Sequence, residues 1–437
     1  MIVPSIDILG GKAVQLRGGR HPILEVGDPE VLAEKLSRAG EIAVVDLDAA
    51  LGKGSNKDIV KRIIAKYPCR VGGGIRSREL ALEYLDLGAR AVMIGTKATP
   101  AFLAEFPPER LIAALDTNKE KIMVEGWTKA TEADLFARIE ELGPYVGGFL
   151  VTTIDREGEM NGFDFQRAEA IIKAASGRRV TFAGGASGGE EGATQISRLD
   201  SIGADVQAGT AIATGALSLA RAFAAPLKSD RPDGLWPTTV CDEGGRLLGL
   251  VYSDQESLEA AFESGRGVYK SRSRGLWKKG ETSGNSQDLI RADLDCDRDC
   301  IRFTVRQNGK GFCHLGRRNC FDTGYGIEKL SRTVEARFKE APEGSYTRRL
   351  FSDSSLLASK LREEADELAK ASGAAEAAFE AADLIYFAMV KAQVEGASFR
   401  DIEAELERRS YKVQRRPGNA KPGYEDTEGG SRWTGIH

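Results

Sequence analysis

Residues 1–226 alternate short β-branched runs with helix-length segments, and this alternation restricts the fold more than any other feature. Eight such runs occur: IVPSID, IAVVDLD, CRVGGG, AVMIG, LIAALD, GGFLVT, RVTFAGG and ADVQAG. Regular alternation of strand and helix predicts a parallel sheet covered by helices. Eight repeats favour a closed (β/α)8 barrel over an open sheet.

The two halves of this region repeat each other. IDILGGKAV is echoed by LDTNKEKIMVEGW, VGGGIRS by AGGASGG and VMIGT by VQAGT, and Asp7 and Asp116 are 109 residues apart. Glycines at strand ends let the backbone approach a ligand, and amide groups there hold phosphate. The doubling therefore predicts a substrate with a phosphate at each end, on which Asp7 and Asp116 act as base and acid. The predicted phosphate contacts are Gly73, Gly74, Gly95, Thr96, Gly184, Gly185 and Gly209.

These motifs, with GDP, VVDLDAA, IGTKA and TTIDREGEMNGFDF, resemble the phosphoribosylformimino-aminoimidazole carboxamide ribotide isomerase of histidine biosynthesis over the whole first region. The resemblance implies an Amadori rearrangement of an aminoaldose to an aminoketose, without an organic cofactor. It implies that Asp7 is the base and Asp116 the acid, and that Trp127 and Thr152 help to place the substrate.

The first region departs from that family at three points. Glu157 stands where Asp is usual, Ala49 where Gly is usual, and the loop RGGRHPILEVGDP is short. Such loops complete a site when they close. A non-catalytic scaffold or binding module is therefore the alternative for the barrel, although a scaffold needs neither Asp7 nor Asp116.

The composition changes twice along the chain, which predicts several domains. After the barrel, the segment PLKSDRPDGLWP has the Pro, Asp and Gly content of a linker. The expected divisions are the barrel at 1–226, the linker at 227–236, a small α+β zinc domain at 237–335, an all-α helical-bundle domain at 336–414 and a tail of disordered composition at 415–437.

Four of the six cysteines lie in DLDCDRDCIRFTVRQNGKGFCHLGRRNC. Cys296, Cys313 and Cys320 match a catalytic zinc site, which has three protein ligands and one position for water. His314 is placed to move a proton near that water. The alternative is a set of buried cysteines beside an acidic turn. Cys300 precedes an apolar alternation and is predicted to be a core residue.

Three aspartates alternate in the same stretch. In an extended segment Asp295, Asp297 and Asp299 would project from one face. Carboxylates suit Mg²⁺ better than zinc, so these residues predict a magnesium site.

The flanking text SGRGVYKSRSRGLWKKGETSGNSQ, with DCDRD, GFCH and RRNCF, resembles phosphoribosyl-AMP cyclohydrolase. The resemblance implies zinc-dependent hydrolysis that opens the adenine ring between N1 and C6. It also implies a homodimer in which Cys296 of one subunit meets Cys313 and Cys320 of the other. A basic cluster is either the phosphate and ribose contact or a solvated edge strand: Arg272, Arg274, Lys278 and Lys279.

The third region has Leu and Ala at helical spacing among many glutamates. KLREEADELAKA brings together Glu363, Glu364 and Glu367, and FEAADLIYFAMVKA carries Glu380 and Asp383 at the same spacing. Two such helices can build a carboxylate cage for Mg²⁺ in a bundle. Single acids on a Leu-rich helix are more often solvated.

With SYTRRLF ahead of it, this region resembles phosphoribosyl-ATP pyrophosphohydrolase of the all-α nucleotide pyrophosphatase kind. The resemblance implies Mg²⁺-assisted attack of water between the α and β phosphates of an ATP-derived nucleotide, with Glu364 and Glu367 as catalytic candidates. Arg348, Arg349 and Lys360 are candidate phosphate contacts. A general nucleoside-triphosphate hydrolase is the alternative.

Composition and context limit the remaining choices. The net charge of -4 argues against a nucleic-acid surface, and no apolar run is long enough to span a bilayer. A strand from the first residue predicts no signal peptide, and hence a cytoplasmic protein with reduced cysteines.

The three implied reactions are consecutive, which favours a multifunctional histidine-biosynthesis enzyme resembling the fused eukaryotic protein. Since the sequence ends at His437, the histidinol dehydrogenase of that fused type is expected to be absent. A cyclohydrolase and pyrophosphohydrolase with a scaffold barrel is the alternative.

Overall fold

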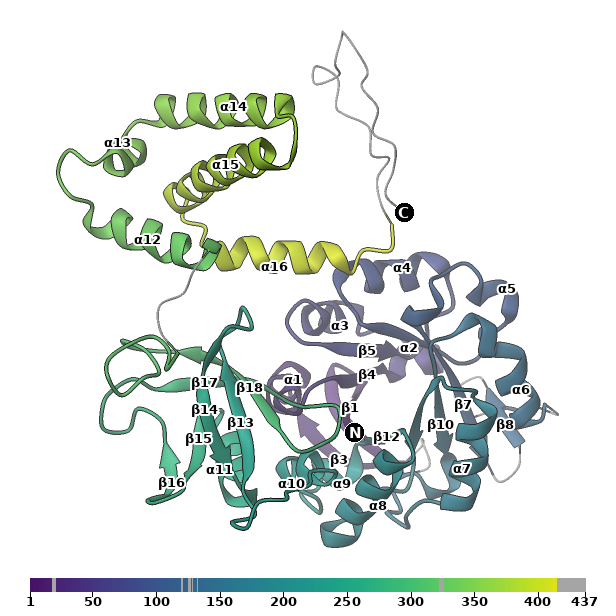
Figure 1. Ribbon diagram of the computed structural model, residues 1–437. Helices are drawn as coiled ribbons and strands as arrows, with labels where there is room; N and C mark the ends of the chain where they lie inside the picture. The colour runs from purple at the N-terminus through teal and green to yellow at the C-terminus, as the bar shows by residue number, and fades with distance from the viewer. Residues whose placement is uncertain are drawn as a thin grey trace.

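The computed structural model shows a barrel, a small sheet beside it and a group of helices above both (Figure 1). The predicted tail lies outside the described residues, which are 1–17, 21–118, 121–124, 127, 129–131, 133–321 and 326–414.

Eight parallel strands close into the predicted barrel. They pair in the order β1, β4, β5, β6, β7, β10, β11 and β12, and β12 pairs back to β1. The strands are β1 (Ile2–Leu9), β4 (Ile42–Asp46), β5 (Cys69–Gly72), β6 (Ala91–Ile94), β7 (Leu111–Asn118), β10 (Gly148–Thr153), β11 (Arg179–Ala183) and β12 (Ala204–Ala208). The outer helices include α1 (Pro29–Leu36), α3 (Lys57–Ile64), α4 (Arg78–Leu87), α6 (Leu135–Leu142), α7 (Phe165–Ala174), α8 (Gly189–Ser201) and α10 (Leu219–Ala224).

Both halves of the barrel begin in the same way. In the first half β1 continues into the antiparallel strands β2 (Lys12–Arg17) and β3 (His21–Gly27). In the second half β7 continues into β8 (Lys121–Val124) and β9 (Lys129–Ala130). The strands that carry Asp7 and Asp116 therefore occupy equivalent places in the two halves.

The second region is a small α+β unit. Its four-stranded sheet has the order β14, β13, β18, β17, and a separate hairpin pairs β15 with β16. The elements are β13 (Trp236–Cys241), β14 (Leu247–Ser253), α11 (Gln255–Ser264), β15 (Val268–Ser271), β16 (Gly275–Lys278), β17 (Gln287–Leu294) and β18 (Ile301–Gln307). One continuous apolar core joins this sheet to the barrel, and across it the rings of Phe223 and Phe262 lie 5.3 Å apart.

The third region is helical, as predicted, but begins earlier than expected. It comprises α12 (Gly326–Glu340), α13 (Tyr346–Ser352), α14 (Ser354–Lys370), α15 (Ala374–Val394) and α16 (Phe399–Ser410). Helix α12 crosses the expected boundary at 335, because its Val334 packs with Leu350, Leu357 and Phe387 in a core of the helical region. Every described helix is too short or too polar to cross a membrane.

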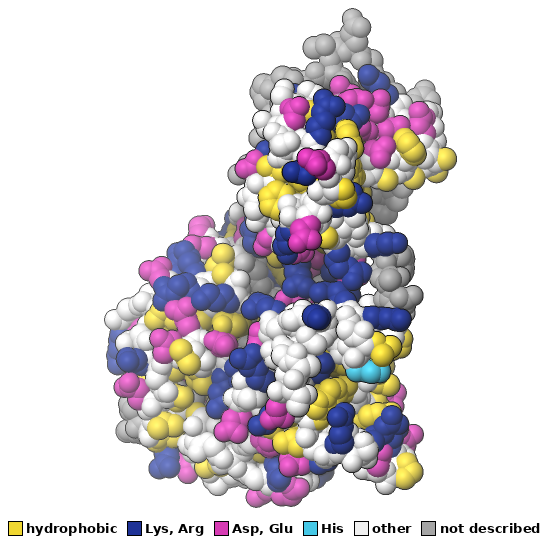
Figure 2. Space-filling view, turned by 90° about the vertical axis from the view of Figure 1, so that its left-hand side faces the viewer, with side chains coloured by type: hydrophobic (Ala, Val, Ile, Leu, Met, Phe, Trp, Pro, Cys, Tyr) yellow, Lys and Arg dark blue, Asp and Glu magenta, His cyan; other side chains and the backbone are white. Residues whose placement is uncertain are grey.

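Charged side chains join the helical region to the rest. Arg246, after β13, pairs with Glu403 of α16 at 2.7 Å, and Arg400 of α16 pairs with Glu243 at 2.6 Å. Figure 2 shows Lys and Arg side chains gathered where the helical part meets the part below it. Beyond α16 the chain returns to the barrel, where Arg110 donates to the carbonyl oxygen of Tyr411 at 2.8 Å.

Replacing Gly73 by Ala should destabilise the barrel by at least about 2 kcal/mol. An added Cβ would lie 2.2 Å from the carbonyl oxygen of Asp46, and φ is +91°. Gly177→Ala is the matched control, because φ is +81° there but no described atom lies within 4 Å of the added Cβ. Chemical unfolding should show the smaller loss for the control, and equal losses would contradict the predicted clash.

Candidate active sites

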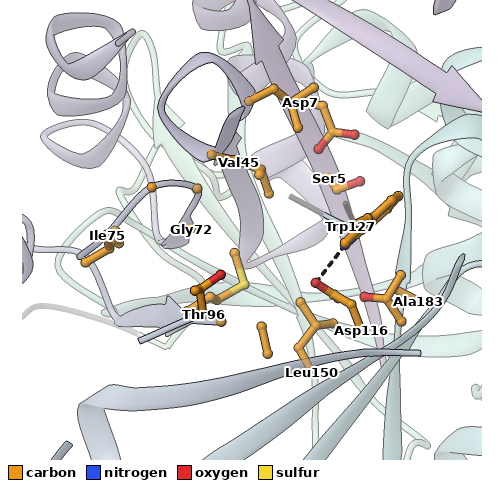
Figure 3. A pocket seen from close by; sticks show the side chains of 18 of the residues that line it. Ser5, Asp7, Val45, Gly72, Ile75, Thr96, Asp116, Trp127, Leu150 and Ala183 are labelled. Carbon is orange, nitrogen blue, oxygen red and sulfur yellow. Dashed lines mark hydrogen bonds between the residues drawn. The ribbon is translucent and has the colours of Figure 1, made fainter. Parts of the chain in front are cut away.

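The mouth of the barrel holds the first candidate site. Asp7 of β1 and Asp116 of β7 line one cavity with Thr152 of β10, and Trp127 lines it beside Asp116 (Figure 3). Parallel strands present their carboxyl ends at the same face of a barrel, so residues distant in sequence meet there. Among the predicted phosphate contacts, Gly73, Gly74, Gly95, Thr96 and Gly209 line this cavity.

The remaining predicted glycines lie beside it. Gly184 and Gly185 line a smaller adjoining cavity that shares Glu157 and Gly209 with the first. At Gly184 an added Cβ would lie 2.4 Å from the carbonyl oxygen of Thr153, so this loop tolerates only glycine without movement. The two glycine sets thus flank the acids from opposite halves of the barrel.

Trp127 fixes the orientation of Asp116. Its indole Nε1 donates to Oδ2 of Asp116 at 2.7 Å, and the residue itself has a positive φ of 67°. Burial raises the pKa of Asp116, while hydrogen bonds from Trp127 and Thr152 oppose that rise. The carboxyl group of Asp116 is therefore held by two side chains at the mouth of the barrel.

A third acid shares this cavity. Burial raises the pKa of Asp7 to about 7. Burial and then the negative charges of Asp7 and Asp116 raise the pKa of Glu157 to about 8. Buried acids with raised pKa values near neutrality are the groups that proton transfer requires.

Several polar residues of the cavity were not predicted, among them Arg76, Lys97 and two residues on barrel strands. Ser5 and Gln207 both line it, and Oε1 of Gln207 is buried without a partner among the described residues. Alternation along a strand was the available signal. Ser5 lies two residues before Asp7 and Gln207 two before Gly209, so each shares a face with a predicted residue.

The second region brings two of the three predicted zinc ligands together. Cys313 is buried and Cys320 is exposed at its surface, and burial followed by the charge of Cys313 raises the pKa of Cys320. Lys279 is buried beside them, and its Nζ lies 5.3 Å from the ring centroid of Phe312. Burial lowers the pKa of Lys279, which the two thiols oppose.

Cys296 stands apart from this pair within one chain. It is exposed, and among the described residues it does not join Cys313 and Cys320 in a group of ligand atoms within 4.8 Å of one another. His314 is also exposed. Cys300 is partly buried, and its thiol donates to the carbonyl oxygen of Ile301 at 3.6 Å.

The predicted magnesium carboxylates meet, but not in an extended segment. Asp295, Asp297 and Asp299 place one oxygen each within 4.8 Å of one another. The backbone bends here because Oδ1 of Asp295 accepts from the amides of Asp299 at 3.0 Å and Cys300 at 3.1 Å. We call residues 295–300 the acidic turn. The expectation of an extended segment is therefore wrong, since the first aspartate closes a turn.

The basic cluster divides into exposed and buried members. Arg272, Arg274 and Lys278 are exposed on the β15–β16 hairpin, whereas Lys279 is buried. The guanidinium of Arg272 lies over the ring of Tyr252 at 5.1 Å. Among these four residues, Lys279 is thus the one whose charge interacts with the thiol pair, and the other three are exposed.

The helical region gathers its predicted acids in two overlapping groups. Glu363, Glu364 and Glu367 of α14 form one, and Glu364 joins Glu380 and Asp383 of α15 in the other. Glu364 is buried, and Oε2 of Glu380 is buried without a partner among the described residues. An unpaired carboxylate oxygen in a partly buried group of acids fits a cation, because the charges otherwise repel one another.

The candidate phosphate contacts of this region differ in their surroundings. Lys360 pairs with Glu363 and Glu364, each at 2.7 Å. Arg348 and Arg349 are exposed on α13. Lys360 therefore neutralises the acids in this structure, and the two arginines remain accessible to a phosphate.

The fold and its sites place the chain in a class of multidomain proteins: a barrel with acids at its mouth, followed by two regions that carry their own clusters of thiols and acids. The family of Histidine biosynthesis proteins matches residues 1–218, Phosphoribosyl-AMP cyclohydrolase matches 249–322, and Phosphoribosyl-ATP pyrophosphohydrolase matches 327–410. The chain belongs to the histidine biosynthesis protein family.

Similar proteins carry related names. A histidine biosynthesis trifunctional protein of Neurospora crassa is 41% identical over 73% of this chain and 38% of its own length. A histidine biosynthesis bifunctional protein of Schizosaccharomyces pombe is 48% identical over 48% of this chain and 50% of its own. An imidazole-4-carboxamide isomerase of Methanothermobacter thermautotrophicus is 36% identical over 43% of this chain and 83% of its own. The chain thus spans half or less of the two fungal proteins and most of the isomerase.

Replacing Asp7 by Asn should make the protein more stable above neutral pH. Unfolded, Asp7 ionises near 3.8, whereas folded it keeps its proton up to about pH 7, so stability is lost as the pH rises between these values. The variant avoids this loss, which is about 4 kcal/mol at pH 8. Chemical unfolding at acidic and at alkaline pH measures the gain in stability. Asp58→Asn is the control, because Asp58 is exposed. A gain in stability that does not grow with pH would contradict the raised pKa of Asp7.

Proposed function

We propose that this chain catalyses three successive steps of histidine biosynthesis. The helical region would convert phosphoribosyl-ATP to phosphoribosyl-AMP and pyrophosphate. The second region would open the adenine ring of that product, and the barrel would isomerise the resulting aminoaldose to the aminoketose. The observation that carries the proposal is the occurrence of three separate acid or thiol clusters, each within the region that matches the corresponding family.

In the barrel, Asp7 and Asp116 would exchange protons with the middle of a substrate held at both ends. A pKa of about 7 leaves Asp7 partly ionised at neutral pH, so it can accept a proton. Asp116, held by Trp127 and Thr152, would donate the proton. The two glycine sets support phosphate binding at opposite ends, because they line the cavities from opposite halves of the barrel and backbone amides at strand ends can hold phosphate.

In the second region, Cys313 and Cys320 would hold zinc together with Cys296 of a second subunit. The thiol donors fit this metal, and the separation of Cys296 within one chain supports a homodimer that shares the site. When bound, zinc supplies a water that is acidic near neutral pH. Lys279 would then orient the nucleotide, and exposed His314 would carry a proton between solvent and the reacting ring.

In the helical region, Glu364, Glu367, Glu380 and Asp383 would hold Mg²⁺. The unpaired buried oxygen of Glu380 is the observation that supports this fit. When bound, the ion neutralises phosphate charge. Arg348 and Arg349 would orient the phosphates. A cytoplasmic location accords with six cysteines that are all unpaired.

Supplying the 437-residue protein with phosphoribosyl-ATP, Mg²⁺ and Zn²⁺ should yield the aminoketose. Because isomerisation conserves mass, chromatography must separate it from the aldose. With Asp7→Asn the series of reactions should stop at the aldose, because the rate of isomerisation falls by more than about 100-fold. Accumulation of the aldose by the unaltered protein would instead show that the barrel is a scaffold, and rapid cleavage of ordinary nucleoside triphosphates would favour a general hydrolase.

Replacing Cys313 by Ser should remove bound zinc and lower ring opening by more than about 100-fold, because a thiolate ligand is lost. Pyrophosphate release should not change. Cys241→Ser is the matched control, since Cys241 is equally buried but lies on β13 outside the described ligand groups. Metal analysis and product chromatography measure both effects. Full ring opening by zinc-free protein would exclude the proposed site.

A further inference from the structure

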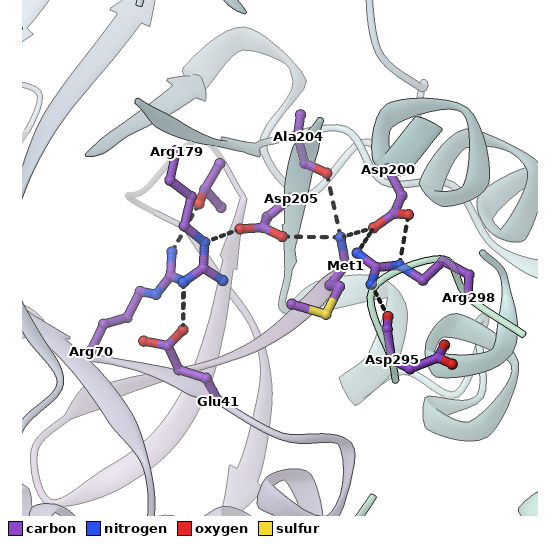
Figure 4. A network of polar contacts seen from close by, with 10 residues as sticks. Met1, Glu41, Arg70, Arg179, Asp200, Ala204, Asp205, Asp295 and Arg298 are labelled. Carbon is purple, nitrogen blue, oxygen red and sulfur yellow. Dashed lines mark hydrogen bonds and ion pairs between the residues drawn. The ribbon is translucent and has the colours of Figure 1, made fainter. Parts of the chain in front are cut away.

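A side chain of the acidic turn reaches out of its own region to the barrel. Arg298 donates through Nε to Oδ2 of Asp200 and through Nη2 to Oδ1 of the same carboxylate, both at 3.0 Å (Figure 4). Asp200 lies near the end of α8 and is nearly buried. Such a two-point pair fixes both the distance and the orientation of its partners.

The same guanidinium also closes the turn. Its Nη1 donates to the carbonyl oxygen of Asp295 at 2.5 Å, and the carbonyl oxygen of Arg298 accepts from the amide of Lys228 at 2.7 Å. Side chain and backbone of Arg298 are therefore both held by residues outside the small sheet. A shift of the barrel surface would move the turn directly.

The backbone of Arg298 shows that this conformation is imposed. Its φ is 68°, a left-handed value that favours glycine and that side-chain-bearing residues adopt when other contacts compensate. The compensating contacts are those with Asp200, Asp295 and Lys228. They hold three mutually repelling carboxylates within 4.8 Å of one another.

The anchor on the barrel side is itself fixed. The amino group of Met1 donates to Oδ1 of Asp200 at 2.8 Å and to Oδ1 of Asp205 at 3.0 Å. Asp205 pairs with Arg179, which contacts Glu41 beside buried Arg70 (Figure 4). The turn is thus attached to a chain of ion pairs that crosses the barrel end.

We propose that Asp200 of the barrel and Arg298 form a positioning pair that holds Asp295, Asp297 and Asp299 in the arrangement that Mg²⁺ binding by the acidic turn requires, and that the same pair places Cys296 of this turn for zinc binding. The inference rests on the proposed function for the role of zinc in ring opening. It gives the barrel a part in ring opening that is independent of whether the barrel is itself catalytic.

Magnesium titration of the 437-residue protein tests this pair. Asp200→Asn and Arg298→Gly are compared in a Glu380→Gln background, so that Mg²⁺ binding by the helical region is weakened equally in every sample. Glycine at 298 accepts the left-handed backbone, so that variant removes the guanidinium without adding strain. Asp288→Asn is the matched control, because it breaks an Asp–Arg pair with Arg266 elsewhere on the same sheet.

Each single variant should bind Mg²⁺ about 10-fold more weakly or worse, and the double variant no more weakly than the singles. The control should bind as the background does. Ring opening, measured with wild-type Glu380, should fall in kcat with little change in KM, while pyrophosphate release stays constant and reports intact folding. Arg298→Lys should keep only part of the Mg²⁺ affinity and of the ring-opening rate, since lysine cannot donate two parallel hydrogen bonds to one carboxylate.

Unchanged Mg²⁺ affinity in either single variant, or no titratable Mg²⁺ site in the background protein, would overturn the inference. Strictly additive losses would also overturn it, because the two residues would then act separately. Absence of ring opening by zinc-loaded unaltered protein would instead reject the proposed function, and the Mg²⁺ titration would still decide the positioning role.

Discussion

Closure of the parallel sheet between β1 and β12 is the constraint on which the rest of the structure depends. It brings the carboxyl ends of eight strands to one mouth, where Asp7 and Asp116 meet although a large part of the barrel sequence separates them. The same closure places α8 and α10 on the side where the small sheet packs, so the two parts share one apolar core. Both the acid site and the inter-region contact follow from it.

The protein gathers negative charge in three places and compensates each differently. In the barrel, burial favours the protonated acids, which raises the pKa of Asp7 and Glu157 into the neutral range. In the acidic turn, two backbone amides donate to the carboxylate of Asp295, and Arg298 donates to its carbonyl oxygen. In the helical region Lys360 pairs with the glutamates, yet one oxygen of Glu380 stays unpaired. The three arrangements accord with three roles: proton transfer in the barrel, a fixed backbone at the acidic turn and cation binding in the helical region.

Sequence patterns predicted the barrel, because strand and helix periods are local and its repeat places Asp7 and Asp116 equivalently. They also paired Glu380 with Asp383, since helical spacing fixes which residues of one helix share a face, whereas the approach of Glu364 from α14 depends on how the two helices pack. The acidic turn escaped prediction because alternation of Asp residues looks like a strand, whereas hydrogen bonds from their own backbone determine the bend. The contact of Arg298 with Asp200 was not predictable either, because the two residues come together only when the acidic turn packs against α8 of the barrel.

The contacts of helix α16 determine the order in which the regions can fold while the chain is being synthesised. It contacts the small sheet through Arg400 and Glu403, and residues 411–414 return to the barrel, where Asp86 accepts from the amide of Val413 at 2.7 Å. The barrel cannot close before β12 has left the ribosome, and α16 has no docking surface before the sheet is complete. The helical region should therefore assemble last, upon a surface already formed. Slowing translation between the sheet and α12 would then separate two folding events within one polypeptide.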